Sequence, residues 1–238
     1  MSSEAAVSRH LERLVSIMNV LPITTAEAKP WIMQKHYARR MPCVQYAFGL
    51  YDNRLLVGIV TYGTPSSSPL RIGLCGEGVT VLELNRLCIE HTNQNAASIL
   101  VGRSLRQLPT CAVVSYADTA QGHIGYVYQA TNWLYTGLSA KRTDWHVEGM
   151  EGLHGQTIAD KTRGMDNRAQ AMRDIYGDAF SLIDRPRKHR YVYFCGTRKE
   201  RKAMRDALRY EVKPYPKGDT RRYDASAEFA TQPLLLEC

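Results

Sequence analysis

The sequence has no long hydrophobic run, although 44% of its 238 residues are hydrophobic. No apolar stretch approaches the roughly 20 residues of a membrane-spanning helix, so we expect no membrane partner. The N-terminal stretch SSEAAVSRHLERL also lacks the charged-then-apolar pattern of a secretory signal. These two absences predict a soluble protein of the cytoplasm.

Cysteine is sparse, and its spacing is irregular. None of the six cysteines forms a Cys-x-x-Cys pair and most lie within apolar segments, so we expect reduced, buried thiols. The spacing Cys88-x-x-His91 is compatible with one side of a metal site. In a strand, however, these two side chains would point to opposite faces, which favours a core cysteine and a loop histidine. Whether a metal binds stays open.

Internal repeats and a Walker-type phosphate loop are also absent. Hydrophobic and charged contents of 44% and 23% are ordinary for a globular protein, and with the length they predict a single domain. Residues 1–24 would hold an amphipathic helix over 3–19 and a first strand. Residues 25–200 would form the core, and residues 201–238 a basic helix and arm.

Positive charge is concentrated near the C-terminus. The net charge is +8, but residues 185–222 alone carry 14 Lys or Arg against 4 acidic residues, so the remainder is slightly acidic. Tyrosines are interleaved with these cations, a composition that attracts a phosphate backbone. The alternative is a solvated helix face followed by a flexible tail.

Residues 116–137, YADTAQGHIGYVYQATNWLYTG, contain the central candidate site. They follow the apolar run CAVVS, which predicts a buried strand, so Asp118 is expected just past the strand tip. The apolar spacing that follows predicts a helix carrying Tyr128. Open α/β sheets bind ligands beyond the carboxyl ends of their strands, which favours a site here. The alternatives are that Asp118 caps the helix and that Tyr128 is a core aromatic.

A second candidate group is HYARR, residues 36–40, at the end of a predicted helix with Thr25 as its N-cap. The imidazole of His36, the phenol of Tyr37 and two guanidinium groups suit the binding of an anion or a base. A lone histidine is more often an ordinary surface residue, so a functional role for His36 requires evidence from other residues.

Two apolar strands, VQYAFGLY and LLVGIVTYG, are predicted to form a hairpin joined by Asp52-Asn53. The segment VTVLELNRLCIEH predicts a further strand, in which a bulge is one option. An arginine inside such a strand is costly unless it is paired or faces a cleft. Arg86 is therefore either neutralised by Glu83 or displayed to a ligand.

Small residues open the helix that follows this strand. Backbone amides at such a helix N-terminus can approach a phosphate, and the helix dipole favours negative charge there. The candidate cofactor-binding residues are Asn95, Ala96, Ala97, Ser98, Arg103 and Ser104.

The order helix, hairpin, strand, small-residue loop, helix, strand, helix, strand, with a Tyr in VYQATNW, resembles the GNAT acyltransferase superfamily. The resemblance implies an α/β fold of the α+β type, with a mixed, mostly antiparallel central sheet and helices on both faces, here with a basic C-terminal extension. It also implies a phosphate-binding turn before the central helix. The turn NQNAAS departs from the superfamily pattern, Arg/Gln-x-x-Gly-x-Gly/Ala, because it has no glycine.

More narrowly, HYARRMP, ELNRL, the YAD turn, GHIGYVYQATNWLYTG and KHRYVYF resemble the Mom DNA-modification family of Mu-like bacteriophages over residues 30–217. That resemblance implies an enzyme of the host cytoplasm that converts adenine in double-stranded DNA to its N6-carbamoylmethyl (acetamido) derivative and protects phage DNA from host restriction. By motif position, the implied catalytic residues are His36, Tyr37, Arg86, Asp118 and Tyr128.

The chemistry of adenine suggests a role for each of them. Asp118 would accept a proton from the weakly nucleophilic amine, Tyr128 would protonate a leaving group, and Arg86 would balance an oxyanion. His36 and Tyr37 would hold the base, which must be flipped out of the stack. The cations expected to hold the DNA backbone are Arg39, Arg40, Arg187, Lys188, Arg190, Arg198, Lys199, Arg201 and Lys202.

The acyl donor stays open. Plain acetyl transfer from acetyl-CoA gives an acetyl amide, so this donor would need a metal or radical step, for which iron has been suggested in the family. Glycyl-tRNA would instead bring the required nitrogen. Coenzyme A or tRNA is therefore a candidate partner, and a dimer is one option for the oligomeric state. Two other functions are considered: a conventional N-acetyltransferase on a small amine or protein, and a non-catalytic DNA-binding regulator.

Overall fold

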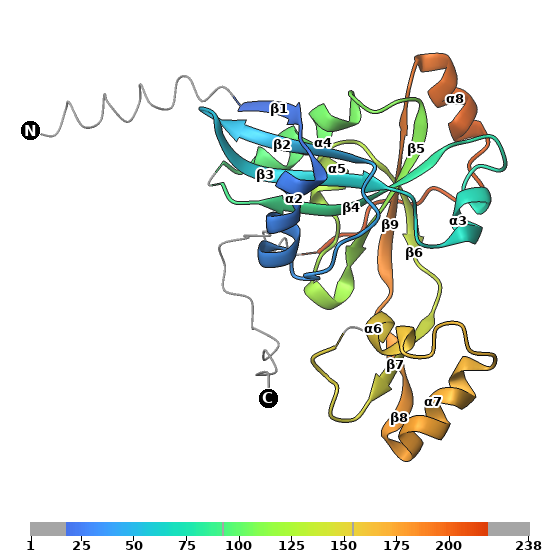
Figure 1. Cartoon of the computed structure of the whole chain (residues 1–238). Coiled ribbons are helices and arrows are strands. Elements are labelled where there is room, and N and C mark those ends of the chain that lie inside the picture. Colours follow the sequence, from blue (N-terminus) through green and yellow to red (C-terminus); the bar gives the residue numbers. More distant parts are fainter. Residues whose placement is uncertain (1–17, 92, 154, 219–238) are drawn as a thin grey trace, which may run out of the picture.

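The computed structural model describes residues 18–91, 93–153 and 155–218 (Figure 1). The helix predicted over residues 3–19 therefore lies outside the described residues, apart from Met18 and Asn19, which belong to a strand. The predicted C-terminal arm lies outside them from residue 219 onward.

A seven-stranded mixed sheet forms the centre of the molecule, with the strand order β1-β2-β3-β4-β5-β9-β6 (Figure 1). β4 and β5 run parallel, and the other neighbouring pairs are antiparallel. The predicted fold class, a mixed and mostly antiparallel sheet, is confirmed. The strands are β1 (Met18–Pro22), β2 (Tyr46–Asp52), β3 (Leu55–Gly63), β4 (Val81–Ile89), β5 (Cys111–Asp118), β6 (Leu134–Leu138) and β9 (Lys188–Cys195).

The predicted hairpin is β2–β3, and its turn lies one residue later than expected. Asn53 and Arg54 both adopt positive φ, 46° and 73°. Two consecutive residues of this kind form the turn whose twist matches that of the flanking strands. Asparagine is among the residues that tolerate this conformation best, so Asn53 is a reliable turn signal.

β4 and β5 are joined over a short length. Residues 81–83 of β4 pair with residues 112–114 of β5, although the two strands have nine and eight residues. Just beyond the last pair, the Ser115 hydroxyl lies 2.9 Å from the Leu84 carbonyl oxygen and bridges the strands. Parallel strands end at the same edge of a sheet, so the gap between β4 and β5 opens toward Asp118.

A β-bulge at Asn85 redirects the side chains of β4. The register between β3 and β4 shifts between Thr61 and Tyr62, which leaves Asn85 as the extra residue. Side chains three positions apart in a regular strand point to opposite faces, but the extra residue puts Glu83 and Arg86 on the same face. The bulge that was one option for this strand is therefore present.

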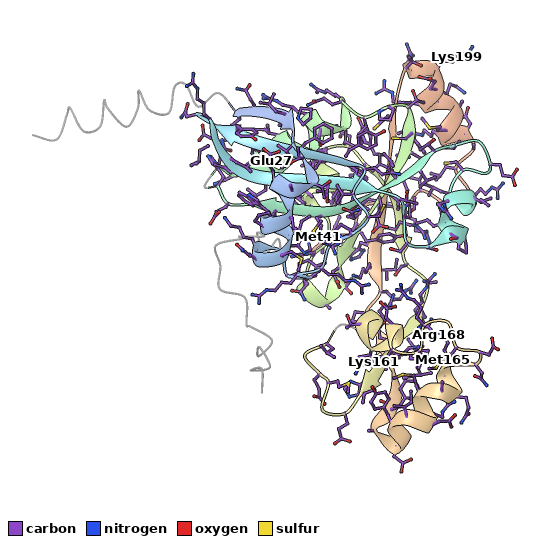
Figure 2. The ribbon with its side chains drawn as sticks, viewed as in Figure 1. Glu27, Met41, Lys161, Met165, Arg168 and Lys199 are labelled. Atoms are coloured by element: carbon purple, nitrogen blue, oxygen red, sulfur yellow. The ribbon has the colours of Figure 1, made fainter. Side chains whose placement is uncertain are left out.

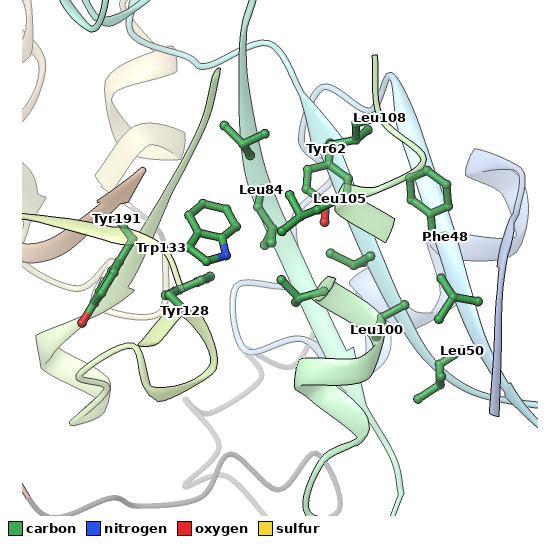
Figure 3. Packing of buried hydrophobic residues seen from close by; sticks show 14 of the residues in the cluster. Phe48, Leu50, Tyr62, Leu84, Leu100, Leu105, Leu108, Tyr128, Trp133 and Tyr191 are labelled. Atoms are coloured by element: carbon green, nitrogen blue, oxygen red, sulfur yellow. The ribbon is translucent and has the colours of Figure 1, made fainter. Parts of the chain in front are cut away.

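Helices cover both faces of the sheet. Helices α4 (Ala96–Leu105) and α5 (Tyr126–Ala130) contribute to the largest buried cluster on one face (Figure 3). The other face is covered by α2 (Thr25–Pro30), the π-helical turn η1 (Trp31–Lys35), α3 (Ser68–Gly73) and α8 (Arg198–Asp206). The alternation of β5 confirms the two faces, since Val113 packs with α4 whereas Ala112 and Val114 pack with α3 and α8.

Helix α2 begins one residue earlier than predicted. Thr24, and not Thr25, is its N-cap and forms a capping box with Glu27. The Glu27 N–H donates to Thr24 Oγ1 at 3.2 Å, and the Thr24 N–H donates to Glu27 Oε2 at 2.7 Å. This reciprocal pair satisfies two backbone donors that the helix leaves free.

The segment after β5 contains less helix than its apolar spacing suggests. A 3-10 turn, η2 (Thr119–Gln121), precedes the single turn-and-a-half of α5. Gly122 and Gly125 have positive φ, 67° and 81°, and a Cβ at Gly125 would lie 2.3 Å from the Tyr191 ring. Glycine is therefore required at residue 125 for both conformation and space.

A small module between β6 and β9 was not anticipated as a unit. Its own two-stranded sheet consists of β7 (Arg142–Val147) and β8 (Phe180–Arg185), with α6 (Gly155–Asp160), α7 (Arg168–Tyr176) and the 3-10 turn η3 (Gly177–Ala179). Val147, Ile158 and Met172 are buried in its separate hydrophobic cluster. Figure 1 shows this module at one end of β9 and α8 at the other end.

Five of the six cysteines lie within the described residues. Four of the five cysteines there are free and buried, as expected, while Cys43 is free and exposed. Cys88 is buried in β4, and His91 Nε2 lies 2.9 Å from Asp52 Oδ2. In this part of the chain, no helix is both long enough and apolar enough to cross a membrane.

The core contains one buried hydroxyl pair whose energetics can be tested. Ser104 Oγ lies 2.7 Å from the Tyr62 hydroxyl and donates to the Val101 carbonyl, and both side chains are wholly buried. We expect Ser104→Ala to lower the free energy of unfolding by about 1–3 kcal/mol, because it strands the Tyr62 hydroxyl. In a Tyr62→Phe background the same change should cost clearly less. Urea unfolding of the four proteins measures this, and equal costs in both backgrounds would contradict the pairing.

Candidate active site

Four of the five predicted catalytic residues belong to one face of the sheet, around the gap between β4 and β5. His36 and Tyr37 follow η1, which packs on that face. The bulge turns Arg86 of β4 toward the same face. Asp118 ends β5 and, by alternation from residues 112 and 114, also points there.

The His36 and Tyr37 rings stack with centroids 4.4 Å apart. His36 is 6% exposed, and its Nδ1 accepts the Ala38 N–H at 3.0 Å. Burial, followed by the positive charge of Arg86, lowers the pKa of His36 to about 3. The imidazole is therefore neutral near pH 7, and because Nδ1 accepts, the proton resides on Nε2. His36 is thus suited to donate a hydrogen bond rather than to act as a cation.

The pKa of Tyr37 reports the charges around its hydroxyl. Burial raises this pKa above its ordinary value, and the Asp118 carboxylate raises it further, whereas Lys188 and Arg86 lower it. The Tyr37 ring also meets the His123 ring edge-on, with centroids 6.4 Å apart. Tyr37 is 37% exposed, so its ring lies at the open side of the cluster, within range of charges from β4, β5 and β9.

Arg86 is anchored by backbone carbonyl groups. Its Nε and Nη2 donate to the Arg40 carbonyl at 3.2 and 2.8 Å, and its Nη1 donates to the Asn85 carbonyl at 2.6 Å. Carbonyl oxygens satisfy these donors without neutralising the guanidinium charge. Arg86 therefore fixes the loop that follows Tyr37 and keeps a positive charge beside the gap.

Asp118 lies opposite Lys188 in the β5–β9 ladder and is 9% exposed. Lys188 Nζ is 2.7 Å from Asp118 Oδ2, and Asp118 Oδ1 accepts the Ala120 N–H at 3.0 Å. Asp118 thus caps η2, as the simpler interpretation of the sequence proposed. A carboxylate offers about four lone-pair positions, so two bonds leave room for a further donor. Lys188, predicted as a DNA contact, is placed inside this cluster.

Tyr128 approaches the gap from the opposite face, where it packs 5.1 Å from both Trp133 and Tyr191, ring centre to ring centre (Figure 3). Its hydroxyl lies 2.8 Å from Ser115 Oγ. Ser115 Oγ is also 2.9 Å from the Leu84 carbonyl oxygen, so two acceptors, this carbonyl and the Tyr128 oxygen, lie beside the single Ser115 proton. Burial raises the pKa of Tyr128 well above its ordinary value. Tyr128 is therefore a core aromatic whose hydroxyl contacts Ser115 at the edge of the gap.

Three further residues of the cluster escaped the sequence analysis as site residues. Burial raises the pKa of Glu83, although Arg86 and Lys188 lower it. Burial also lowers the pKa of His123, which the Asp118 charge raises. Ser115 lies inside an apolar run. Two features of the sequence could have identified site residues. They are the ELNR spacing together with a bulge, for Glu83, and a histidine between two glycines in GHIG, for His123.

The structure places the residues predicted to bind a cofactor in two separate groups. Residues 95–98 form the N-cap and first turn of α4, beyond the carboxyl end of β4. Ser98 Oγ donates to the Asn95 carbonyl at 2.9 Å. Arg103 and Ser104 do not join them, because Arg103 donates to the Met18 carbonyl and Ser104 is buried beside Tyr62. Both therefore serve the packing of α4 against the sheet.

The cations predicted to bind DNA lie on separate parts of the molecule and do not form one face. Lys188 and Cys195 mark the two ends of β9, a separation of ~23 Å at about 3.3 Å per residue. Figure 2 shows Lys199 on α8 at the far end from Lys161 and Arg168 of the module. The basic segment is therefore divided between the two ends of one strand.

Several of these cations bind the protein itself. Arg187 Nε donates to the Ser139 carbonyl at 2.6 Å, and Arg190 Nη2 donates to the Thr136 carbonyl at 3.0 Å. Arg40 Nη2 lies 3.4 Å from Asp160 Oδ2 of the module. The backbone of the neighbouring Arg39 has a positive φ of 39°. The exposed predicted cations of α8 are Arg198, Lys199, Arg201 and Lys202.

The mostly antiparallel sheet, its helices on both faces and the polar cluster at its parallel pair define a mixed α/β protein. The model of the Mom protein family matches residues 17–217, and the chain belongs to that family. It is 30% identical over 203 residues to the methylcarbamoylase Mom of Escherichia phage Mu, with 80% of each chain covered.

Solved acetyltransferase structures are also similar to the chain. An N-acetyltransferase from Staphylococcus aureus Mu50 is 8% identical with a TM-score of 0.39, covering 75% of this chain and 98% of that one. A second structure, described as histone acetyltransferase HPA2 and related acetyltransferase from Corynebacterium glutamicum, is 11% identical with a TM-score of 0.40. The match covers 77% of this chain and 98% of that one.

The buried neutral His36 makes stability depend on pH. Its folded pKa of about 3 lies below the ordinary value of 6.5, so the unfolded chain takes up a proton first as the pH falls. This contribution is complete above pH 6.5 and decreases from there toward pH 3. Between pH 6.5 and 5 we expect the free energy of unfolding to fall by about 1.5 kcal/mol from this residue.

Denaturant unfolding of the wild type and of His36→Gln at pH 7, 6.5 and 5 tests this expectation. The variant should show the smaller loss on acidification, because glutamine does not titrate. An identical pH dependence in both proteins would contradict the buried neutral imidazole.

Proposed function

We propose that this chain is a DNA-modification enzyme of the host cytoplasm that converts adenine in double-stranded DNA to its N6-carbamoylmethyl derivative, protecting phage DNA from restriction. Membership of the Mom family supports the proposal, as does the name of the phage Mu relative, a methylcarbamoylase. The observation that carries it is the convergence of His36, Tyr37, Arg86 and Asp118 from three separate segments on one gap in the sheet.

The first task of the site is to activate a weak nucleophile. The lone pair of the exocyclic amine is delocalised into the adenine ring, so bond formation at N6 requires removal of a proton. Asp118 has remaining acceptor capacity and takes that proton as N6 attacks the donor carbon. Lys188 holds the Asp118 carboxylate from the other side and balances its charge.

The other residues bind the base and the developing charge. The stacked His36–Tyr37 pair presents an aromatic surface and an Nε2–H donor to the base. The guanidinium of Arg86 stabilises negative charge on the donor oxygen. Tyr128, whose hydroxyl lies 2.8 Å from Ser115 Oγ at the edge of the gap, is the candidate proton source for the leaving group.

Atom counting favours an aminoacyl donor. An acetyl group lacks the nitrogen of the product, whereas a glycyl amide, N6–CO–CH2–NH2, is an isomer of the carbamoylmethyl product, N6–CH2–CO–NH2. We therefore favour glycyl-tRNA over acetyl-CoA, followed by a rearrangement within the adduct. The first turn of α4, residues 95–98, is the place for a donor phosphate in either case.

An iron ion would be held by side chains such as His, Cys, Asp and Glu. Among the described residues, no group of three or more His, Cys, Asp or Glu side chains is placed to hold a metal ion. The described residues thus do not provide an iron site of that kind, and the steps above use the side chains of the chain itself.

The target base must leave the duplex before Asp118 can reach its amine. Base flipping costs a few kcal/mol, which contacts to the phosphate backbone offset. The module is linked to the loop after Tyr37 by the Arg40–Asp160 pair, so the two lie on the same side of the gap. DNA is therefore the proposed macromolecular substrate at this end of β9.

Loss of the Asp118 carboxylate should abolish modification. We expect Asp118→Asn to lower the yield of N6-carbamoylmethyl-deoxyadenosine by about 10²-fold or more, and Tyr128→Phe to lower it less, since general acid–base catalysis contributes about 10²–10⁴. Mass spectrometry of nucleosides from plasmid DNA in expressing bacteria measures the product.

Matched controls are Asp178→Asn and Tyr126→Phe, both at exposed positions, and both should retain full modification. Unchanged adenine with folded wild-type protein would sink the proposed function. Acetyl-CoA turnover on small amines would then indicate a conventional N-acetyltransferase, and tight DNA binding without any product would indicate a regulator.

The donor is tested with purified protein and plasmid DNA. Carbon-labelled glycyl-tRNA should transfer its label to adenine, whereas labelled acetyl-CoA should not, because an acetyl group cannot supply the amide nitrogen. Uncharged tRNA with free labelled glycine is the control. Absence of label in DNA from glycyl-tRNA, with active protein, would eliminate this donor.

A further inference from the structure

Helix α8 carries a positive stripe that the active-site cluster does not use. Arg198, Arg201, Lys202 and Arg205 follow the spacing i, i+3, i+4, i+7, so they share one face of the helix, and all are exposed. Met204 is buried on a different side and fixes the helix to the sheet through the cluster of α3 and β9. The stripe therefore has a fixed orientation and faces solvent.

The carboxylates of α8 leave most of this charge uncompensated. Glu200 is taken by the capping box with Thr197, at 2.8 Å from its N–H and 2.6 Å from its hydroxyl. Asp206 pairs with Lys202 at 2.6 Å. Because Glu200 already occupies the start of the helix, an anion would be bound by the side chains of the stripe and not by the helix N-terminus.

A hollow of about 510 Å³ lies beside the stripe, between the start of α8 and the end of α4. Its lining includes Glu200 and Arg201 of α8 and adds one further cation, Arg106. Arg198 and Arg205 are seven residues apart, so the stripe is ~10 Å long. One DNA strand places a phosphate about every 3.4 Å along the duplex axis, so the stripe matches roughly three consecutive phosphates.

The position of α8 separates it from the target base. It follows Cys195, whereas Lys188 and Asp118 lie at the other end of β9, ~23 Å away. That distance corresponds to about 7 base pairs of duplex. We propose that the α8 stripe is a second DNA site, which binds the phosphate backbone of the substrate duplex about 7 base pairs from the flipped adenine. This inference rests on the proposed function, because it takes duplex DNA as the substrate.

The test compares duplex lengths. A 9-base-pair duplex with a central adenine extends ~14 Å to each side and does not reach α8, whereas a 25-base-pair duplex extends ~41 Å and does. The variant Arg198→Gln/Arg201→Gln/Arg205→Gln removes three positive charges of the stripe and keeps helix-forming side chains. The control Lys29→Gln/Arg54→Gln/Arg71→Gln removes three exposed charges elsewhere.

Fluorescence anisotropy between 50 and 200 mM salt measures affinity. On the long duplex the stripe variant should lose at least roughly tenfold, and its salt slope should fall by about 2.7, or 0.9 for each of three phosphates. On the short duplex it should match the wild type, and the control should match on both. Equal loss at both lengths, no loss at either, or equal loss in the control overturns the proposal.

Two further outcomes are informative. If the stripe variant loses affinity for a tRNA-like stem but keeps it for the long duplex, the occupant is RNA and the proposal fails. Binding is measured without catalysis, so a chain that never modifies adenine but shows the length-dependent loss refutes the proposed function and leaves the α8 site standing. Thermal unfolding verifies that both triple variants fold as the wild type does.

Discussion

The short contact between β4 and β5 is the constraint on which the site depends. Three residue pairs hold these parallel strands together, and beyond them the sheet opens. An open sheet would expose backbone groups on both strands, and the Ser115 hydroxyl satisfies the Leu84 carbonyl at the first unpaired position. The same hydroxyl lies 2.8 Å from the Tyr128 hydroxyl, so the group that closes the gap on one face also holds a phenol beside it.

The bulge at Asn85 supplies the second half of this arrangement. It turns Arg86 onto the face of Glu83, and the Arg86 side chain then takes the carbonyl of Arg40. A strand without the bulge would send that guanidinium into the apolar core under α4, where an unpaired charge is strongly unfavourable. One inserted residue thus positions both a half-buried cation and the loop that carries His36 and Tyr37.

The charges of the cluster are arranged so that its histidine stays neutral. Arg86 and Lys188 bring two positive charges close to His36, while the Asp118 carboxylate is paired with Lys188. Burial is the main cause of the lowered pKa of the imidazole, and these charges add to it. A neutral donor, a phenol with a raised pKa and a carboxylate with free acceptor positions can bind a neutral heterocycle and move one proton, which is the chemistry that adenine requires.

The catalytic candidates were predictable because each lies in a local motif with a local physical reason. An apolar run followed by Tyr-Ala-Asp predicts a carboxylate at a strand tip, and Asn53 predicts a turn whatever surrounds it. Pairing across the sheet was not predictable in the same way. In the sequence, Lys188 is one cation in a basic run, and only the β5–β9 register places it opposite Asp118.

Local chain chemistry therefore sufficed for the class of the sheet, the β2–β3 hairpin and the choice of candidate residues, since these depend on spacing and on neighbours in the chain. The division of the basic segment between two ends of β9, the place of Ser104 in the core, and the meeting of Glu83, Arg86 and Asp118 at one gap were decided by tertiary structure. The reason is that strand register and side-chain facing result from contacts between residues far apart in sequence, and a single inserted residue reverses them.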